Sequence, residues 1–182
     1  MKEDINVIYV SEIKETICKE GQNAGEPVLE IRVTKQEKNK HTIKQIIDIL
    51  TETRKGLVYW SGDDPMIYGD QISEIIDKTK FRDHQVKTNG EILKPVLQKF
   101  SYILFIPKNT VHAENCLKFL KRFVDLYWHV VDIMIETDID NVGKDLLGYA
   151  SMLSPSDEKV KQKVWKYCIE HNLRFNPNLK GD

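Results

Sequence analysis

The sequence has few cysteines and no long apolar run. Only three of its 182 residues are cysteines, and Cys18, Cys116 and Cys168 lie far apart in the chain. An odd number of separated cysteines fits neither a disulfide framework nor a local zinc motif, so we expect reduced thiols in the core. No stretch approaches the roughly 20 apolar residues that a membrane span needs, and no secretory signal opens the chain. These absences predict a cytoplasmic protein without membrane contact.

A strong charge of either sign is also missing. The chain has 27 Lys and Arg against 28 Asp and Glu, which gives a formal net charge of -1. This balance gives no electrostatic reason to bind nucleic acid, and nucleic acid is therefore excluded from the expected partners. The five histidines are scattered without a metal-ligand spacing, so no metal site is predicted. With no repeat or Gly/Ser linker, residues 1–182 are expected to form one domain.

Apolar β-rich runs alternate with helical patterns along the chain. Such alternation is typical of βα units and predicts an α/β fold with a mainly parallel sheet. About six strands are too few for a closed eight-stranded barrel, which leaves a partial barrel or a twisted open sheet. In either case the ligand site is expected at the carboxyl ends of the strands. The predicted strands are 28–34, 57–61, 84–87, 102–107, 131–137 and 149–153.

The helices are predicted from apolar residues three or four positions apart. Ile43, Ile46, Ile47 and Leu50 form one such stripe, and residues 72–76 carry a second. A third helix is predicted over 111–127, with Cys116, Leu117, Leu120, Phe123, Val124 and Tyr127 on its buried stripe. For the last helix we expect Ser154 as the cap, Pro155 at the first position, and Val160, Val164, Tyr167 and Cys168 on the buried face.

Five segments in order carry a resemblance to one family. They are residues 11–32, the turn Trp60-Ser61-Gly62-Asp63-Asp64-Pro65-Met66-Ile67, the segment Val86-Lys87-Thr88-Asn89-Gly90, the segment Ile106-Pro107-Lys108, and residues 168–180. Together they resemble the 7-carboxy-7-deazaguanine synthases, which are radical S-adenosylmethionine enzymes. The resemblance implies a partial (β/α)6 barrel-like radical S-adenosylmethionine fold of reduced size. It also implies a homodimer.

The resemblance also implies which residues bind a ligand. In the family, the counterparts of Glu20, Gly21 and Arg32 help to hold a tetrahydropterin carboxylic acid. The turn at Gly62 meets the amino group of S-adenosylmethionine in these enzymes, where this chain has Asp63 in place of Gly and Asp64 in place of Glu. The ligand-binding residues implied in this way are Glu20, Gly21, Arg32, Gly62, Asp63, Asp64, Thr88, Asn89, Gly90 and Lys108.

The cysteine loop of the family has no counterpart in this chain. The family places a CxxxCxxC loop after the first parallel strand, and its three thiolates hold a [4Fe-4S] cluster. Here residues 33–41 contain no cysteine, and 35–41 are expected to form a short, charged, solvated connection. Without the cluster there is no electron to cleave S-adenosylmethionine. We therefore expect no cofactor and a pseudoenzyme that binds a pterin or purine-like molecule or a protein partner.

Two other functions stay open at this point. The chain can be an enzyme with cluster-free chemistry that uses Glu20, Asp63, Asp64 or Lys108 as acid-base groups, because neighbouring carboxylates can raise one pKa. It can also be a structural subunit with a filled pocket. Single residues have ordinary interpretations too: Glu20 and Arg32 can form a ligand-binding pair or a surface ion pair, and residues 62–65 are also an ordinary turn composition.

Overall fold

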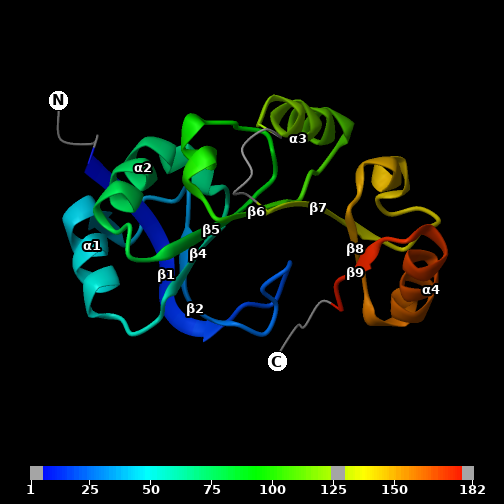
Figure 1. The fold of residues 1–182 in the computed structure, drawn as a ribbon, viewed down its shortest axis with the longest axis horizontal. Helices are drawn as coiled ribbons and strands as arrows, with labels where there is room; N and C mark the ends of the chain where they lie inside the picture. The colour runs from blue at the N-terminus through cyan, green and yellow to red at the C-terminus, as the bar shows by residue number, and fades with distance from the viewer. Residues whose placement is uncertain (1–5, 124–129, 178–182) are drawn as a thin grey trace.

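The strands form one curved, mainly parallel sheet, seen as an arc in Figure 1. The computed structural model describes residues 6–123 and 130–177. Within them, nine strands lie in the order β3-β1-β2-β4-β5-β6-β7-β8-β9. All pairs from β2 to β9 are parallel, whereas β1 pairs antiparallel with both β2 and β3. The strands are β1 (Val7–Ile17), β2 (Pro27–Val33), β3 (Lys40–Thr42), β4 (Leu57–Gly62), β5 (Asp83–Thr88), β6 (Tyr102–Phe105), β7 (Val130–Thr137), β8 (Met152–Pro155) and β9 (Arg174–Phe175).

The predicted α/β class and the parallel sheet are confirmed, but no barrel closure is shown. The two outer strands of the described sheet, β3 and β9, do not pair with each other. The sequence predicts no strand before residue 28, and this is wrong, because β1 spans Val7–Ile17 and is the longest of the described strands. Charged and apolar residues share β1 (VIYVSEIKETI), so its pattern is weak, and it is defined instead by its register with β2. Of the described residues, no helix is long and apolar enough to cross a membrane.

The α-helices lie along the outside of the arc in Figure 1. They are α1 (Ile43–Glu52), α2 (Gly69–Lys78), α3 (Thr110–Phe123) and α4 (Lys161–His171), with short 3-10 helices η2 (Pro65–Tyr68), η3 (Pro95–Lys99), η4 (Lys144–Tyr149) and η5 (Glu158–Val160) between elements. The predicted stripe of α1 is confirmed for Ile43, Ile46 and Leu50, which are buried. Cys116 is fully buried, as predicted for the third helix, and residues 124–127 of that prediction lie outside the described residues.

The predicted start of the last helix is wrong. Ser154 and Pro155 end β8, and the following turn is instead capped by Asp157, whose side chain accepts a hydrogen bond from the amide of Lys159 at 2.7 Å. Proline tolerates the end of a strand because no ladder hydrogen bond is needed from its nitrogen there. Of the predicted buried face, Val164 and Cys168 are buried, while Val160 and Tyr167 are partly buried. Residue 149 of the last predicted strand belongs to η4.

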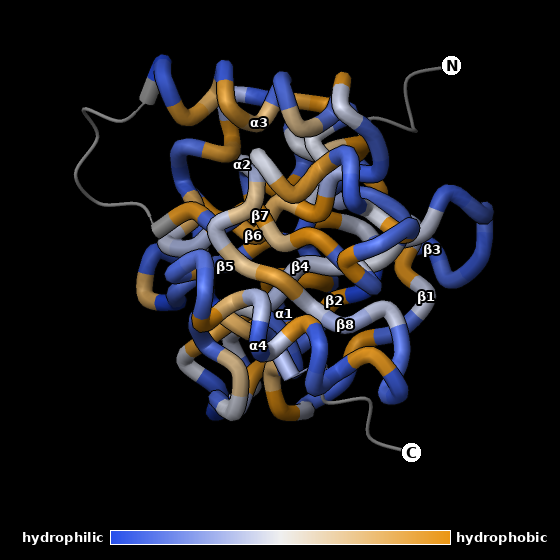
Figure 2. The backbone as a smooth tube through the Cα atoms, turned by 90° about the vertical axis from the view of Figure 1, so that its right-hand side faces the viewer, coloured by the Kyte–Doolittle hydropathy of each residue, from blue (hydrophilic) through white to orange (hydrophobic). Residues whose placement is uncertain are grey.

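Alternation along each strand divides the sheet into two faces. On β4, Val58 and Trp60 belong to the main core under the helices, while Tyr59 belongs to a separate small cluster on the other face. Strand β6 repeats this division, because Ile103 joins the main core and Tyr102 a further small cluster. Figure 2 shows the hydrophobic colouring concentrated on central strands such as β6 and β7. The concave face is therefore the one that can carry polar side chains.

The main core contains one buried histidine that stays neutral. His84 of β5 is 2% exposed; its Nδ1 accepts from Trp60 Nε1 at 3.2 Å, and its Nε2 lies 3.0 Å from Thr79 Oγ1. With Nδ1 as acceptor, Nε2 carries the proton and donates to Thr79, which donates to the carbonyl of Ile75 at 2.7 Å. Burial lowers the pKa of His84 from 6.5 to about 4.

We predict that His84 makes the protein less stable in mild acid. Between pH 6.5 and 4 the unfolded chain binds a proton at this histidine that the folded chain does not, so the free energy of unfolding falls as pH falls. The loss between pH 7 and 5 is about 2 kcal/mol from this group. Urea unfolding of the wild type and of His84→Gln at both pH values measures it. Equal pH slopes in the two proteins would contradict the prediction.

Candidate functional site

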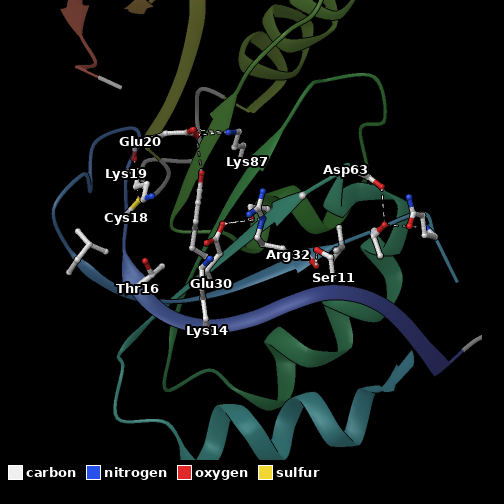
Figure 3. Close-up of a pocket in the computed structure, with 17 residues that line it drawn as sticks. Ser11, Lys14, Thr16, Cys18, Lys19, Glu20, Glu30, Arg32, Asp63 and Lys87 are labelled. Carbon is white, nitrogen blue, oxygen red and sulfur yellow. Dashed lines mark hydrogen bonds and ion pairs between the residues drawn. The ribbon is translucent and has the colours of Figure 1, made fainter. Parts of the chain in front are cut away.

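Two adjoining pockets lie on the concave face and at the carboxyl ends of the parallel strands. The first, which we call the hairpin pocket, has a volume of about 570 Å³ and lies beside the β1–β2 hairpin (Figure 3). The second, the strand-end pocket, has a volume of about 400 Å³ and lies where β4, β5 and β6 end. Gly62, Asp63 and Lys87 line both pockets, which makes them neighbours. This is the location that the predicted fold class favours for a ligand.

Eight of the ten residues implied by the resemblance line these pockets. Glu20 and Arg32 line the hairpin pocket, and Gly62 and Asp63 line both. The strand-end pocket is lined by Asp64, Thr88, Asn89 and Lys108 among others. The structure thus brings together residues from four separate parts of the sequence. Their role in binding stays a prediction.

The other two residues, Gly21 and Gly90, line neither pocket. Gly21 has a φ of +75°, and a Cβ there would lie 2.4 Å from the hydroxyl oxygen of Tyr102. The close approach lets the amide of Gln22 donate to that hydroxyl at 3.0 Å, which anchors the hairpin loop on β6. A Cβ on Gly90, whose φ is +77°, would lie 2.3 Å from the sulfur of Cys116. Both glycines are therefore explained by close packing.

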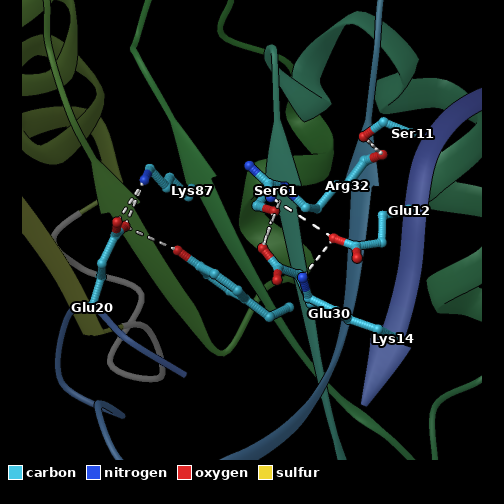
Figure 4. Close-up of polar contacts among 9 residues, drawn as sticks. Ser11, Glu12, Lys14, Glu20, Glu30, Arg32, Ser61 and Lys87 are labelled. Carbon is cyan, nitrogen blue, oxygen red and sulfur yellow. Dashed lines mark hydrogen bonds and ion pairs between the residues drawn. The ribbon is translucent and has the colours of Figure 1, made fainter. Parts of the chain in front are cut away.

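Glu20 pairs with Lys87, and the alternative of a Glu20–Arg32 pair is not what the structure shows. Lys87 Nζ lies 2.6 Å from Glu20 Oε2 and 2.8 Å from Oε1 (Figure 4). Both side chains are less than one-third exposed. Tyr59 also donates to Glu20 Oε2, at 3.5 Å, and burial raises the pKa of Tyr59 well above its usual value. The charge of the Glu20 carboxylate is thus already neutralised by Lys87 inside the hairpin pocket.

Within the described part of the chain, the ionic contacts of Arg32 are long. Its guanidinium lies 3.8 Å from Glu12 and 3.8 Å from Glu30, and its side chain is 48% exposed. Glu30 has a shorter partner, because Ser61 donates to it at 2.7 Å. In Figure 4 these groups form a row across β1, β2 and β4. Because these contacts are long, Arg32 can turn to a ligand with little loss of existing contacts.

The two aspartates of the turn after β4 have opposite environments. Asp64 is 3% exposed, and its Oδ1 accepts from the amide of Met66 at 3.0 Å and from Thr88 Oγ1 at 2.9 Å. Its Oδ2 is buried with no hydrogen-bond partner among the described residues. Burial raises the pKa of Asp64, whereas hydrogen bonds from Lys35 and Thr34 hold the pKa of the exposed Asp63 below its usual value. The sequence predicts one raised carboxyl pKa, and the pKa of Asp64 is raised. The cause is burial and not the neighbouring charge of Asp63.

Lys87 is a pocket residue that the sequence-based set misses. It belongs to the Val86-Lys87-Thr88 segment on which the resemblance partly rests, but the resemblance implies a ligand-binding role only for the residues that follow it. Alternation along β5 is the signal that places it: Val86 is fully buried in the main core, so Lys87 must face the concave side. Ser61 and Glu30 follow from the same parity on β4 and β2.

The fold and the site together define a class: a curved, open α/β sheet with helices outside and a polar site at the strand ends. No family model and no curated protein matches the chain. Among solved structures, it is similar to the crystal structure of QueE from Escherichia coli, with a TM-score of 0.56 and 14% sequence identity over 93% of this chain and 92% of that one. QueE is a 7-carboxy-7-deazaguanine synthase. The chain therefore has a fold similar to that of QueE, and this similarity concerns the fold alone.

The described residues do not fit an iron-sulfur cluster of the kind that the sequence resemblance implies. Such a cluster needs several thiolates at one point. The three thiols are all buried, and Cys18 donates to the carbonyl of Glu20 at 3.2 Å in the wall of the hairpin pocket. Burial raises the pKa of Cys18, Cys116 and Cys168, which disfavours the thiolate form. Within residues 6–123 and 130–177, no three His, Cys, Asp or Glu side chains form a group that can hold a metal ion.

We predict that Gly62 tolerates no side chain. Its φ is +105°, and a Cβ would lie 2.1 Å from the carbonyl oxygen of Val33, which belongs to the paired strand β2. Gly62→Ala should lower the free energy of unfolding by about 3 kcal/mol, because backbone must move and left-handed φ is strained. Gly25→Ala is the matched control, since Gly25 has a φ of +97° with open space around it. Equal losses in chemical denaturation of both variants would contradict the prediction.

Proposed function

We propose that the chain binds a small polar heterocycle of the pterin or purine type in the two adjoining pockets and does not perform radical chemistry. The observation that carries the proposal is that Glu20 and Arg32 line one pocket and Asp64 and Lys108 the other, while Gly62, Asp63 and Lys87 line both. Pockets of 300–1,000 Å³ with a few placed polar groups are typical of small-molecule sites, and both volumes fall in this range.

The polar groups of the pockets suit a ligand with both donors and acceptors. Arg32 and Lys108 can donate to acceptor oxygens or nitrogens of a ring. Asp64 Oδ2 can accept from a ring or exocyclic N–H, which would give this buried oxygen the partner that it lacks in the described residues. Ile106, Pro107 and Ile135 supply an apolar surface in the strand-end pocket against which a planar ring can pack.

The case against radical chemistry is the donor set. The connection after β2 contains no cysteine, and the three thiols of the chain lie in separate places: Cys18 in the hairpin pocket wall, and Cys116 and Cys168 in the main core. A protein partner and a homodimer stay predictions from the resemblance.

We expect calorimetric titration with a tetrahydropterin, guanosine triphosphate or S-adenosylmethionine to show binding of at least one of the three. Arg32→Ala should weaken a ligand of the hairpin pocket, and Lys108→Ala a ligand of the strand-end pocket, each by about tenfold or more, because each removes a charged hydrogen-bond donor. Lys78→Ala is the matched control, since Lys78 pairs with Glu74 on the outside of α2.

Two results would count against the proposal. One is the absence of heat with all three probes. The other is anaerobic reconstitution with iron and sulfide that yields a stable [4Fe-4S] chromophore, because the donor set described above cannot hold one.

A second candidate, an enzyme with cluster-free chemistry, is favoured by one observation. Asp64 combines a raised pKa with a free carboxylate oxygen in the wall of the strand-end pocket, which are properties of an acid-base group. If Asp64 performs catalysis, turnover of a pterin or nucleotide should fall about 100-fold or more in Asp64→Asn, while binding in the titration persists. Turnover that is absent in the wild type, or equal in both proteins, contradicts this candidate.

A further inference from the structure

The connection between β2 and β3 is fixed to the end of β4. We call residues 34–39 the β2–β3 loop. The sequence predicts a solvated connection over 35–41, and residues 35–39 are exposed. Thr34, which precedes them, is only 8% exposed, and Thr34 and Gln36 line the hairpin pocket. This loop stands where the resemblance places the cysteine loop. Its contacts therefore decide the shape of one wall of the candidate site.

Asp63 makes two hydrogen bonds to this loop through one oxygen. Its Oδ2 accepts from the amide of Lys35 at 2.8 Å and from Thr34 Oγ1 at 3.2 Å. The amide of Asp63 donates to the carbonyl of Val33 at 3.1 Å, next to the close contact of Gly62 with the same residue. The end of β4 and the start of the loop are thus joined by backbone and side-chain bonds together.

Tyr68 of η2 holds the loop from the other side. Its hydroxyl donates to the carbonyl of Thr34 at 2.8 Å, while its ring belongs to the main core and is 8% exposed. The remaining polar groups of Thr34 are also occupied: its amide donates to the carbonyl of Tyr9 at 2.9 Å, and its hydroxyl accepts from the amide of Gln36 at 3.1 Å. Every polar group of Thr34 therefore has a partner.

We propose that Asp63 and Tyr68 are positioning residues, which hold the β2–β3 loop as a preformed wall of the hairpin pocket. Asp63 stands where the family has glycine, and its charged side chain thereby has a structural role. The importance of the wall for a ligand rests on the proposed function. The attachment of the loop by Asp63 and Tyr68 rests only on the contacts above. A wall that is ordered before binding lowers the entropic cost of binding.

Amide hydrogen exchange of Lys35 directly tests the attachment of the loop by Asp63 and Tyr68. We expect the Lys35 amide to be protected in the wild type and to exchange about tenfold faster in Asp63→Ala, which removes its acceptor. Asp63→Asn keeps one acceptor oxygen and should be intermediate, and Tyr68→Phe, which keeps the ring, should speed exchange across the loop. Asp77→Ala is the control, because Asp77 is another surface acid, 2.6 Å from Lys99 and on α2.

The pH profile of Lys35 amide exchange distinguishes attachment by an ionised Asp63 carboxylate from a merely structural role of this residue. The pKa of Asp63 is held low by the hydrogen bond from Lys35, so protection should be present at neutral pH and fall as pH drops through that lowered pKa. The charged groups that act on Asp63 are Lys35 and Lys108, and the neighbouring Asp64 titrates at higher pH because burial raises its pKa. In Asp63→Asn the profile should be flat after correction for intrinsic exchange.

Three outcomes would overturn the proposal: an unprotected Lys35 amide in the wild type, unchanged exchange in Asp63→Ala and Tyr68→Phe, or the same acceleration in Asp77→Ala. If Asp63→Ala does not fold, Asp63→Asn and Tyr68→Phe still decide it. Trypsin gives a second readout, because the loop region has cleavage sites after Lys35, Lys38 and Lys40, which should be cut faster in the variants. A failed ligand titration with normal exchange would overturn only the proposed function.

Discussion

The opposite chemistry of the two sheet faces is the constraint on which the rest of the structure depends. A strand sends successive side chains to opposite faces, so an apolar residue toward the helices forces its neighbour onto the concave side. On β4 and β5 the residues toward the helices are Trp60 and Val86, both fully buried. Their neighbours Ser61 and Lys87 then have to face the hollow of the arc, where the pockets lie.

An ion pair and a hydrogen bond across this hollow connect elements that are distant in the sequence. The hairpin loop after β1 contributes Glu20, which meets Lys87 of β5, and Gln22, which donates to Tyr102 of β6. Partly buried pairs of this kind stabilise the fold only modestly, since desolvation offsets much of the Coulomb energy. Their effect on geometry is larger, because together they place the hairpin loop over the concave face and thereby form one side of the hairpin pocket.

The similarity to QueE extends over nearly the whole of both chains, and it is a similarity of scaffold. A fold can host unrelated functions, so the chemistry has to be argued from the site. In this site the loop after β2 has no thiol, and Asp63 connects it to the end of β4. In this chain the wall at that position is made by hydrogen bonds.

The helical and central strand regions could be predicted from sequence because their signal is local. The stripe of Ile43, Ile46 and Leu50 in α1 and the apolar runs of β4 and β6 are repeated over enough residues to define their elements. Strand β1 and the start of α4 could not, because they depend on partners. A mixed sequence such as that of β1 becomes a strand through its register with β2, and Pro155 can end a strand as well as begin a helix.

The sequence by itself determined the α/β class, the mainly parallel sheet and the lack of cysteine in the connection after the first parallel strand, since these follow from local periodicity and from composition. Only the tertiary structure decided that Glu20 meets Lys87 instead of Arg32, that Asp63 is exposed and ionised while Asp64 is buried, and that Gly21 makes room for Tyr102. The physical reason is that pairing and burial depend on distances between residues from different strands, and one chain read in order contains no such distances.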